Sequence, residues 1–364
     1  MKKKLRILSA LYICCALALI PFYWAASLIM LIVFVLMGFM GGSLLLANKL
    51  YLKTNHWKNQ FLFEKNFISN TGYRDNLERN FDVVNLGSNP ALFGFFYENN
   101  KGQNWATGSQ GFPMDFEILK YYHSYVKDGG YVLIPIMPFS SISNFLETRP
   151  DYWSDSYYMK FAKILDYAQT NKLPNSRKLK LKMRFPVVFN PKLIYYILHD
   201  VAPDNRLQIA DQTMQAAELE YDAKRWIKGW MKEFAAKKYE GFWEEKFTPY
   251  FESGAKMLSD MIDYCLYRNL KPVIITIPVS SYLAKEFTPE FRQKMITDFV
   301  NKANVKGAKF LDYMFDERFS KPELFNGSFF LNLNGRKIFT HQVMTDLGVG
   351  GHIVKVLYNK HGGG

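Results

Sequence analysis

The longest pattern in the chain is an apolar run near its N-terminus. Residues 7–48 contain no Asp, Glu, Lys, Arg or His. Because a bilayer core about 30 Å thick needs about 20 apolar residues of helix, this run predicts a membrane anchor over residues 1–50. A cleaved signal peptide is the alternative, although its apolar part would hold only about 7–15 residues. We expect one span, since residues 7–20 alone would form about 21 Å of helix.

Beyond a connector at residues 51–80, apolar runs alternate with helical spacings. Apolar runs typical of buried strands lie at residues 81–86, 131–136, 272–277 and, in shorter form, 309–313. Helical spacing occurs at residues 113–127, 250–268, 288–304 and 334–347. This alternation predicts one three-layer α/β/α domain over residues 81–350, a flavodoxin-like parallel sheet with helices on both faces, followed by a tail at 351–364.

Residues 145–250 interrupt this alternation. They are rich in Tyr, Trp, Phe and Lys and lack strong strand signals, so we expect a mostly helical insertion. A basic run inside it consists of Arg177, Lys178, Lys180, Lys182 and Arg184. This run is either a solvated face or a contact with an anionic polymer or lipid head groups.

Charge bears on orientation and partners. The net charge is +13, and Lys2, Lys3, Lys4 and Arg6 precede the apolar run. Such residues stay on the cytoplasmic side, so one span predicts an extracytoplasmic domain. The alternative, two spans turning near residues 21–24, would return the domain to the cytoplasm. A positive chain suits an anionic membrane surface or wall polymer; without a nucleic-acid motif, we expect no nucleic-acid partner.

The three cysteines predict no disulfide framework. Cys14 and Cys15 fall in the apolar run, so Cys265 stands alone in the rest of the chain.

The first candidate for chemistry is the segment Asn85-Leu86-Gly87-Ser88-Asn89, at the end of the first predicted strand. Open α/β sheets place ligands at the carboxyl ends of their strands. Gly87 permits a tight turn that would direct Ser88 into the crevice, which makes Ser88 a candidate nucleophile. The alternative is an ordinary Gly-Ser turn.

A second candidate is the segment from Gly102 to Gln110. Asn104 would donate its side-chain amide to a developing oxyanion, or bond its own backbone in a loop. Trp105 and Gln110 are the candidate substrate-binding residues of this segment.

The order of these pieces resembles the SGNH/GDSL hydrolase superfamily, in its membrane-anchored bacterial branch. That branch includes the D-alanyl transfer protein of teichoic-acid modification and the alginate acetylation proteins. The resemblance rests on "YLKTNHWKNQ", "VVNLGS", "GQNWATGSQGFPMDFEILKYY", "GGYVLIPIMPFS", "VIITIPVS" and "LFNGSFFLNLNGRKIFT". It implies that Ser88 takes the nucleophile position and Asn104 an oxyanion position.

The last of these segments departs from the family. An Asp-x-x-His usually precedes "Leu-Asn-x-x-Gly", but Gly327 stands at the Asp position and Phe330 at the His position. A serine is a poor nucleophile without an adjacent base. His341 is the nearest substitute along the chain; the other histidines and the carboxylates of Asp312, Asp316 and Glu317 fit structural or solvated positions better. No metal-ligand spacing or cofactor motif is present in the sequence, so we expect neither.

Two functions fit these features. The resemblance implies an O-acyltransferase or esterase that acts on a bacterial surface polysaccharide or teichoic-acid-like polymer beside a membrane-bound O-acyltransferase. The missing Asp and His favour instead a catalytically degenerate partner or polymer-binding subunit of such a system.

Overall fold

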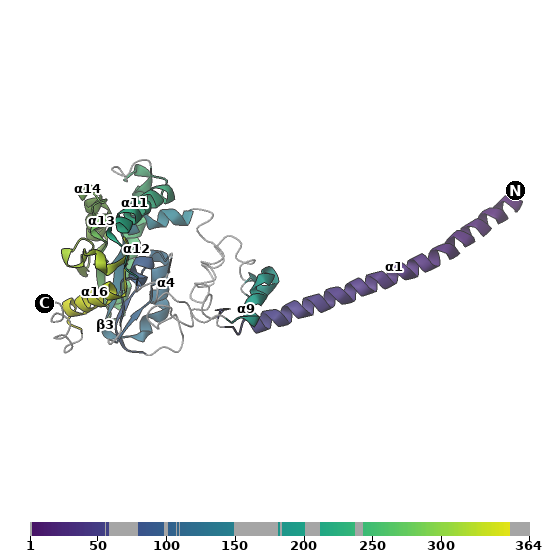
Figure 1. Ribbon diagram of the computed structural model, residues 1–364, viewed down its shortest axis with the longest axis horizontal. Coiled ribbons are helices and arrows are strands. Elements are labelled where there is room, and N and C mark those ends of the chain that lie inside the picture. Colours follow the sequence, from purple (N-terminus) through teal and green to yellow (C-terminus); the bar gives the residue numbers. More distant parts are fainter. Residues whose placement is uncertain are drawn as a thin grey trace. The chain divides into compact units, whose positions relative to one another are not determined.

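The computed structural model describes residues 2–54, 56–57, 79–97, 101–106, 108, 110–148, 181–182, 184–200, 212–236 and 243–349. The chain divides into two compact units (Figure 1). Unit 1 comprises Met1–Trp57 with Lys180–Val201, and unit 2 comprises Lys58–Leu179 with Ala202–Gly364.

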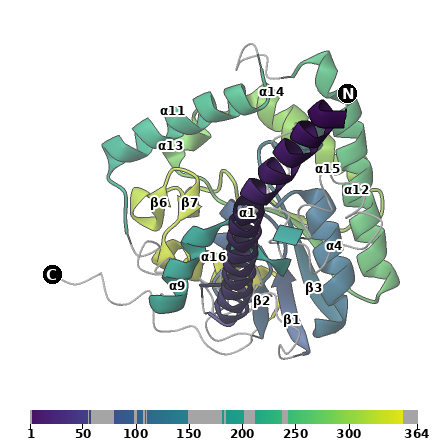
Figure 2. The ribbon, with the colours of Figure 1, turned by 90° about the vertical axis from the view of Figure 1, so that its right-hand side faces the viewer.

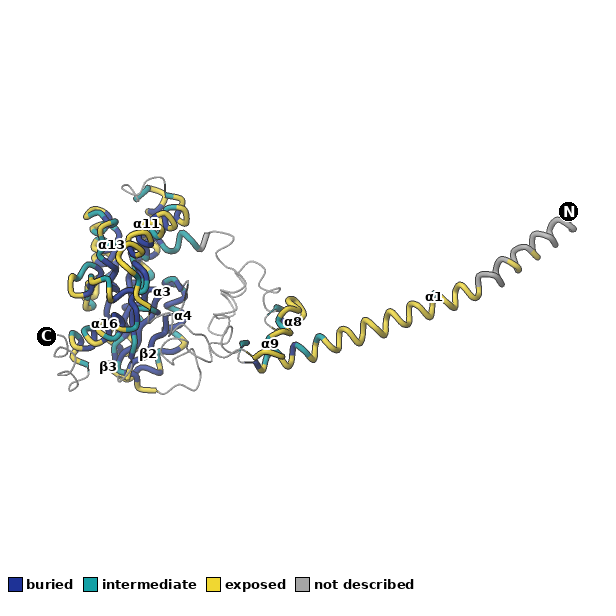
Figure 3. Tube along the Cα trace, in the orientation of Figure 1, coloured by how far each residue is buried: buried dark blue, intermediate teal, exposed yellow. Residues whose placement is uncertain are grey.

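Unit 1 is built on the long helix α1, Lys2–Tyr51. Within it, Ile20–Tyr51 is long and apolar enough to cross a membrane, and its most apolar stretch is not buried in the protein. Figure 3 shows that α1 is exposed over nearly all of its described length. The helix continues through Pro21, so the turn that two spans would need near residues 21–24 is absent. Such an N-terminal helix is compatible with a membrane span and with a signal sequence.

Unit 1 also contains the short helical turns α8 (Pro186–Phe189), η3 (Pro191–Ile194) and α9 (Tyr195–Leu198) among its described residues. They follow one another directly because Pro186 and Pro191 each start a turn and interrupt the one before it.

Unit 2 contains a five-stranded parallel sheet in the order β2-β1-β3-β4-β5. Its strands are β1 (Phe81–Asn85), β2 (Gly102–Asn104), β3 (Val126–Ile136), β4 (Lys271–Thr276) and β5 (Lys309–Leu311). Flavodoxin-like doubly wound sheets have this order. The expected parallel sheet is therefore confirmed.

Helices cover both faces of the sheet (Figure 2). Val84, Ile134 and Ile274 pack with α4 (Phe112–Tyr122) and α12 (Thr248–Tyr267) on one face. Their neighbours along the strands pack with α16 (Leu333–Asp346) on the other face. Because successive strand residues point to opposite faces, both of which are buried, the strands read as continuous apolar runs.

The remaining elements of unit 2 are short, apart from α11. They are α3 (Asn89–Leu92), η1 (His123–Tyr125), η2 (Ser140–Thr148), α11 (Ala216–Glu233), η4 (Glu245–Phe247), α13 (Ser281–Ala284), α14 (Pro289–Arg292), η5 (Gln293–Asp298), α15 (Phe299–Ala303), η6 (Glu317–Phe319), η7 (Pro322–Leu324), β6 (Phe325–Gly327) and β7 (Phe330–Leu331). The last two pair as a separate antiparallel hairpin.

The expected insertion at 145–250 is shared between the two units. Residues 184–200 pack with α1 in unit 1, whereas α11 contributes Ala223, Ile227 and Trp230 to the core of unit 2. Of the basic run, Lys182 and Arg184 are described, and residues 177–180 lie outside the described residues.

Candidate functional site

The sheet order itself marks a site at the end of β1. In a doubly wound sheet, ligands bind outside the carboxyl ends of the strands where the strand order reverses. Here that point lies between β1 and β3, and the residues that follow β1 are Leu86, Gly87 and Ser88. Ser88 begins α3 and is partly exposed, and its side chain makes no capping hydrogen bond. No hydrogen bond of its hydroxyl is present among the described residues.

Gly87 forms the tight turn that the sequence predicts. Its φ of +110° lies in the region that favours glycine. A Cβ at this position would lie 2.7 Å from the Cβ of Ala91 and 3.1 Å from Cγ of Pro135. The turn therefore needs glycine both for its backbone angle and for the close approach of β3 and α3.

We expect Gly87→Ala to destabilise unit 2 by about 3 kcal/mol, because backbone strain and overpacking add. Urea unfolding of the full-length protein in detergent, followed by near-UV circular dichroism, measures this change. The matched control is Gly307→Ala, where φ is +70° but no atom lies within 4 Å of the added Cβ. That control should cost only about 1 kcal/mol. Equal losses for the two variants would show that crowding at Gly87 is unimportant.

A buried carboxylate lies behind the turn. The backbone N–H of Gly87 donates to Oδ1 of Asp115 on α4 at 2.8 Å, and Nε2 of Gln110 donates to the same oxygen. Burial raises the pKa of Asp115 to about 7, although both hydrogen bonds act to lower the pKa. Asp115 therefore fixes the orientation of the turn that carries Ser88.

Asn104 is committed to the backbone around α3. Its Nδ2 donates to the carbonyl oxygens of Ala91 and Leu92 at 3.2 Å and to that of Phe95 at 3.3 Å. Its Oδ1 accepts from Nδ2 of Asn85 at 2.8 Å and from the N–H of Ala106 at 3.0 Å. Asn104 is only 2 % exposed, and this geometry gives it a positioning role for α3, whereas its oxyanion role stays a prediction.

The two expected substrate-binding residues are also buried. Trp105 packs against Tyr122 in the core, and its Nε1 donates to Oε1 of Gln103 at 2.5 Å. Gln110 is bonded to Asp115, as described above. Both side chains thus hold the second segment in place and offer no open surface to a substrate.

Phe330, at the position that the resemblance expects to hold a histidine, lies beside α3. The ring of Phe330 packs 5.2 Å from that of Phe93, which caps α3, and 5.5 Å from that of Trp226 on α11. The structure thus brings β7 to the helix that Ser88 begins, and Phe330 joins an aromatic cluster there.

Asp222 of α11 supplies a carboxylate close to Gly327. A Cβ on Gly327 would lie 3.5 Å from Oδ2 of Asp222. That oxygen accepts from the N–H of Ser328 at 2.8 Å and from its hydroxyl at 2.7 Å, while Arg225 donates to Oδ1 at 2.5 Å. Asp222 therefore holds the β6–β7 turn.

None of the described histidines hydrogen-bonds the Ser88 hydroxyl. His123 follows α4 at the opposite edge of the sheet, where its Nδ1 lies 2.9 Å from the Lys120 carbonyl oxygen and 3.1 Å from the hydroxyl of Tyr264. His341 is exposed on α16. His56 and His199 belong to unit 1. His352 and His361 lie outside the described residues.

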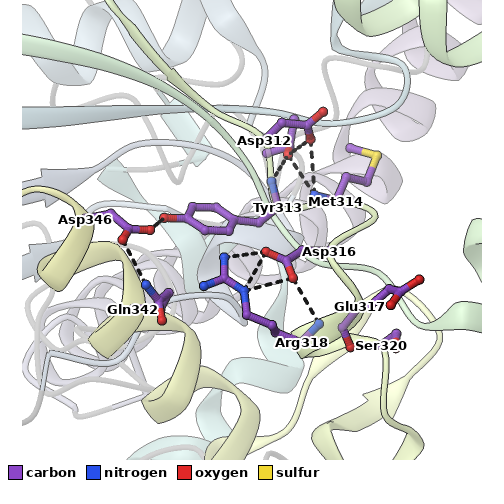
Figure 4. A network of polar contacts seen from close by, with 10 residues as sticks. Asp312, Tyr313, Met314, Asp316, Glu317, Arg318, Ser320, Gln342 and Asp346 are labelled. Atoms are coloured by element: carbon purple, nitrogen blue, oxygen red, sulfur yellow. Dashed lines mark hydrogen bonds and ion pairs between the residues drawn. The ribbon is translucent and has the colours of Figure 1, made fainter.

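The carboxylates at the end of β5 serve local structure (Figure 4). Asp312 accepts from the hydroxyl of Thr276 at 2.5 Å, and Asp316 forms an ion pair with Arg318 at 2.6 Å. The Arg318 hydrogen bond, opposed by partial burial, lowers the pKa of Asp316. Within the described ranges, no group of three or more His, Cys, Asp or Glu side chains could hold a metal ion.

Arg336 is a further buried group that motif reading misses. It is fully buried on α16, and its Nη2 donates to the carbonyl oxygen of Phe95 at 2.6 Å. Its Nε and Nη1 have no hydrogen-bond partner among the described residues. Burial lowers its pKa to about 9. Arg336 thus ties α16 to the loop after α3.

An aromatic hollow lies beside the Phe330 cluster. It has a volume of about 550 Å³ and is lined by Phe145, Trp226, Gly229, Trp230, Lys232, Glu233 and Ala235. Trp226 belongs both to this hollow and to the cluster around Phe330. Pockets lined by aromatic side chains and a few charged ones, here Lys232 and Glu233, are typical of sites for small organic ligands.

Comparison with known proteins adds no identification. No protein-family model matches the chain. No curated protein matches it either.

Proposed function

We propose that this protein is a membrane-anchored, SGNH-like subunit that serves the O-acylation of a bacterial surface polysaccharide or teichoic-acid-like polymer without a catalytic base of its own. Its partners would be the polymer and a membrane-bound O-acyltransferase, with α1 crossing the membrane once and unit 2 on the outer side.

One observation carries the non-catalytic role. Phe330, where the resemblance would place the base, packs between Phe93 and Trp226, and no hydrogen bond reaches the Ser88 hydroxyl within the described residues. Without a base, a serine hydroxyl stays protonated at neutral pH and is a weak nucleophile. The commitment of Asn104 to three carbonyl oxygens supports the same conclusion.

The hollow beside α11 supports a role in polymer binding. Trp226 is partly exposed in the lining of the hollow, and aromatic rings stack well on the apolar faces of sugars. In this role the aromatic cluster around Phe330 would support polymer binding at the place where the resembling family has its base.

Acyl transfer through Ser88 is the second candidate. It is favoured by the position of Ser88 at the switch point, directly after the Gly87 turn, and by the absence of a capping hydrogen bond from the Ser88 side chain. Ser88 would then need a base from a partner protein.

Labelling by a fluorophosphonate probe separates the two candidates. We expect the full-length protein to label no faster than Ser88→Ala, because no resident base activates the hydroxyl. Hydrolysis of p-nitrophenyl acetate should likewise match between the two proteins. Labelling of the wild type that disappears in Ser88→Ala would contradict the non-catalytic role and favour acyl transfer.

Phe330→His is the complementary variant, since it restores an imidazole at the base position. General bases contribute about 10²–10⁴-fold, so an increase in labelling of about tenfold is expected even with imperfect positioning. The increase should vanish in Phe330→His/Ser88→Ala. No increase in a folded Phe330→His protein would contradict the alignment of Phe330 with the family's histidine.

A further inference from the structure

The segment that packs on the end of α1 carries exposed apolar side chains. In residues 184–198, Phe189 is 46 % exposed, Tyr195 56 % and Leu198 77 %. Folded proteins rarely leave a group of large apolar side chains in water without a binding role.

Asn48 fixes this segment to the last turns of α1. Its Nδ2 donates to the carbonyl oxygen of Arg184 at 3.0 Å, and its Oδ1 accepts from the N–H of Val187 at 3.1 Å. Asn48 and Val187 are both buried by this contact. The exposed side chains of the segment therefore continue from the exposed apolar surface of α1.

A second contact closes the same end of unit 1. The ring of Tyr196 stacks on that of His56 at 3.6 Å, and Oδ1 of Asp200 accepts from the N–H of His56 at 3.3 Å. The segment is thus held near its start by Asn48 and near its end by His56, which follows α1.

The exposed charged side chains of the described part of unit 1 are mostly positive. Lys49, Lys53, Arg184 and Lys192 are exposed in unit 1, whereas the acidic side chain described there is that of Asp200. Apolar side chains flanked by Lys and Arg are typical of segments that lie in a membrane interface and contact anionic lipid head groups. Tyr195 and Tyr196 fit the same depth, since Trp and Tyr side chains are enriched at membrane–water interfaces.

We propose that residues 184–198 lie in the interface of the bilayer that α1 enters. Phe189, Tyr195 and Leu198 would insert at the boundary of head groups and acyl chains, and Arg184 and Lys192 would contact anionic head groups. This inference rests on the membrane insertion of α1 proposed above, and gives the base of the anchor a second, surface-bound contact.

Depth measurement in nanodiscs tests the proposal. Full-length protein with Cys14→Ser, Cys15→Ser and Cys265→Ala receives one new cysteine at a time for labelling with the fluorophore NBD. The test positions are Phe189→Cys and Leu198→Cys. Phe34→Cys, within α1, reports insertion of the anchor, and Val305→Cys, 72 % exposed in unit 2, reports water. Nanodiscs of phosphatidylcholine and phosphatidylglycerol carry a spin-labelled lipid as quencher, and near-UV circular dichroism checks folding.

We expect at least twofold stronger quenching at residues 189 and 198 than at 305, with blue-shifted emission. Quenching at 34 without quenching at 189 and 198 would overturn the interfacial contact and leave the anchor intact. Absence of quenching at all four positions would show that α1 is not inserted, which removes the membrane part of the proposed function. Blue-shifted but unquenched labels that appear only with several copies per disc would assign the surface to a second copy of this chain, and so overturn the proposal.

Charge reversal tests the head-group contact separately. Arg184→Glu/Lys192→Glu should weaken quenching at residue 198 by about half in discs with phosphatidylglycerol, and leave it unchanged in pure phosphatidylcholine. An equal loss in both lipids would overturn the electrostatic part of the proposal.

Discussion

Asn104→Ala is expected to destabilise unit 2 by about 4 kcal/mol. The substitution removes a buried amide that serves three carbonyl oxygens around α3 and accepts from Asn85 and Ala106. Each buried polar group left without a partner costs about 1–3 kcal/mol. The carbonyl oxygens of Ala91 and Phe95 keep other donors, the N–H of Gly94 and Nη2 of Arg336. The loss therefore falls on the carbonyl oxygen of Leu92 and on the N–H of Ala106. Urea unfolding in detergent measures the loss.

Asn104→Asp tests the same hydrogen bonds without changing the shape of the side chain. It removes the donating NH₂ group and directs a carboxylate at three carbonyl oxygens, so the loss should equal or exceed that of the alanine variant. The control is Asn301→Ala, at an exposed position on α15, which should change stability by less than about 0.5 kcal/mol. If Asn104→Ala kept the wild-type midpoint while altering reactivity at Ser88, the amide would be an oxyanion donor and the structural assignment would be wrong.

The fold was predictable where apolar patterns are long. β1, β3 and β4 are continuous apolar runs because both faces of each strand are buried. By contrast, Gly102–Asn104 contains only glycine and amide side chains, and becomes strand β2 through its pairing with β1. The β6–β7 hairpin likewise arises from tertiary contacts. The local pattern of apolar and polar residues does not show which strand a short polar segment will pair with.

The candidate site was predictable in place but not in role. Gly87 and Ser88 follow β1 as expected, since a strand end and a glycine turn are local features. The roles of Asn104 and Trp105 depend on burial by elements distant in sequence. An Asp on the apolar face of a helix was a better signal for a residue that positions the site. Asp115 lies on the same face of α4 as Ile118 and Tyr122, and Asp222 is placed similarly on α11. Both carboxylates accept hydrogen bonds from a turn.

The pH dependence of stability should report Asp115. Its pKa is raised from 3.8 to about 7 in the folded protein, so the folded state holds this proton more tightly than the unfolded state. The stabilising effect is fully present below about pH 4, decreases as the pH rises toward 7, and is lost above that. At 1.36 kcal/mol per pKa unit, the free energy of unfolding should fall by up to about 4 kcal/mol across this window.

Asp115→Asn isolates this effect, because it keeps an oxygen that can accept from the N–H of Gly87 and cannot ionise. We expect the variant to match the wild type near pH 4 and to be more stable than the wild type at pH 8. Urea unfolding of both proteins at pH 4, 6 and 8 gives the comparison, and Asp128→Asn, at an exposed position in β3, controls for the loss of one negative charge. If the free energy of unfolding changed with pH in the same way for wild type and Asp115→Asn, the hydrogen bonds from Gly87 and Gln110 would outweigh the effect of burial on the pKa of Asp115. Asp115 would then be a charged carboxylate behind the Ser88 turn, and its negative charge would further disfavour ionisation of that serine.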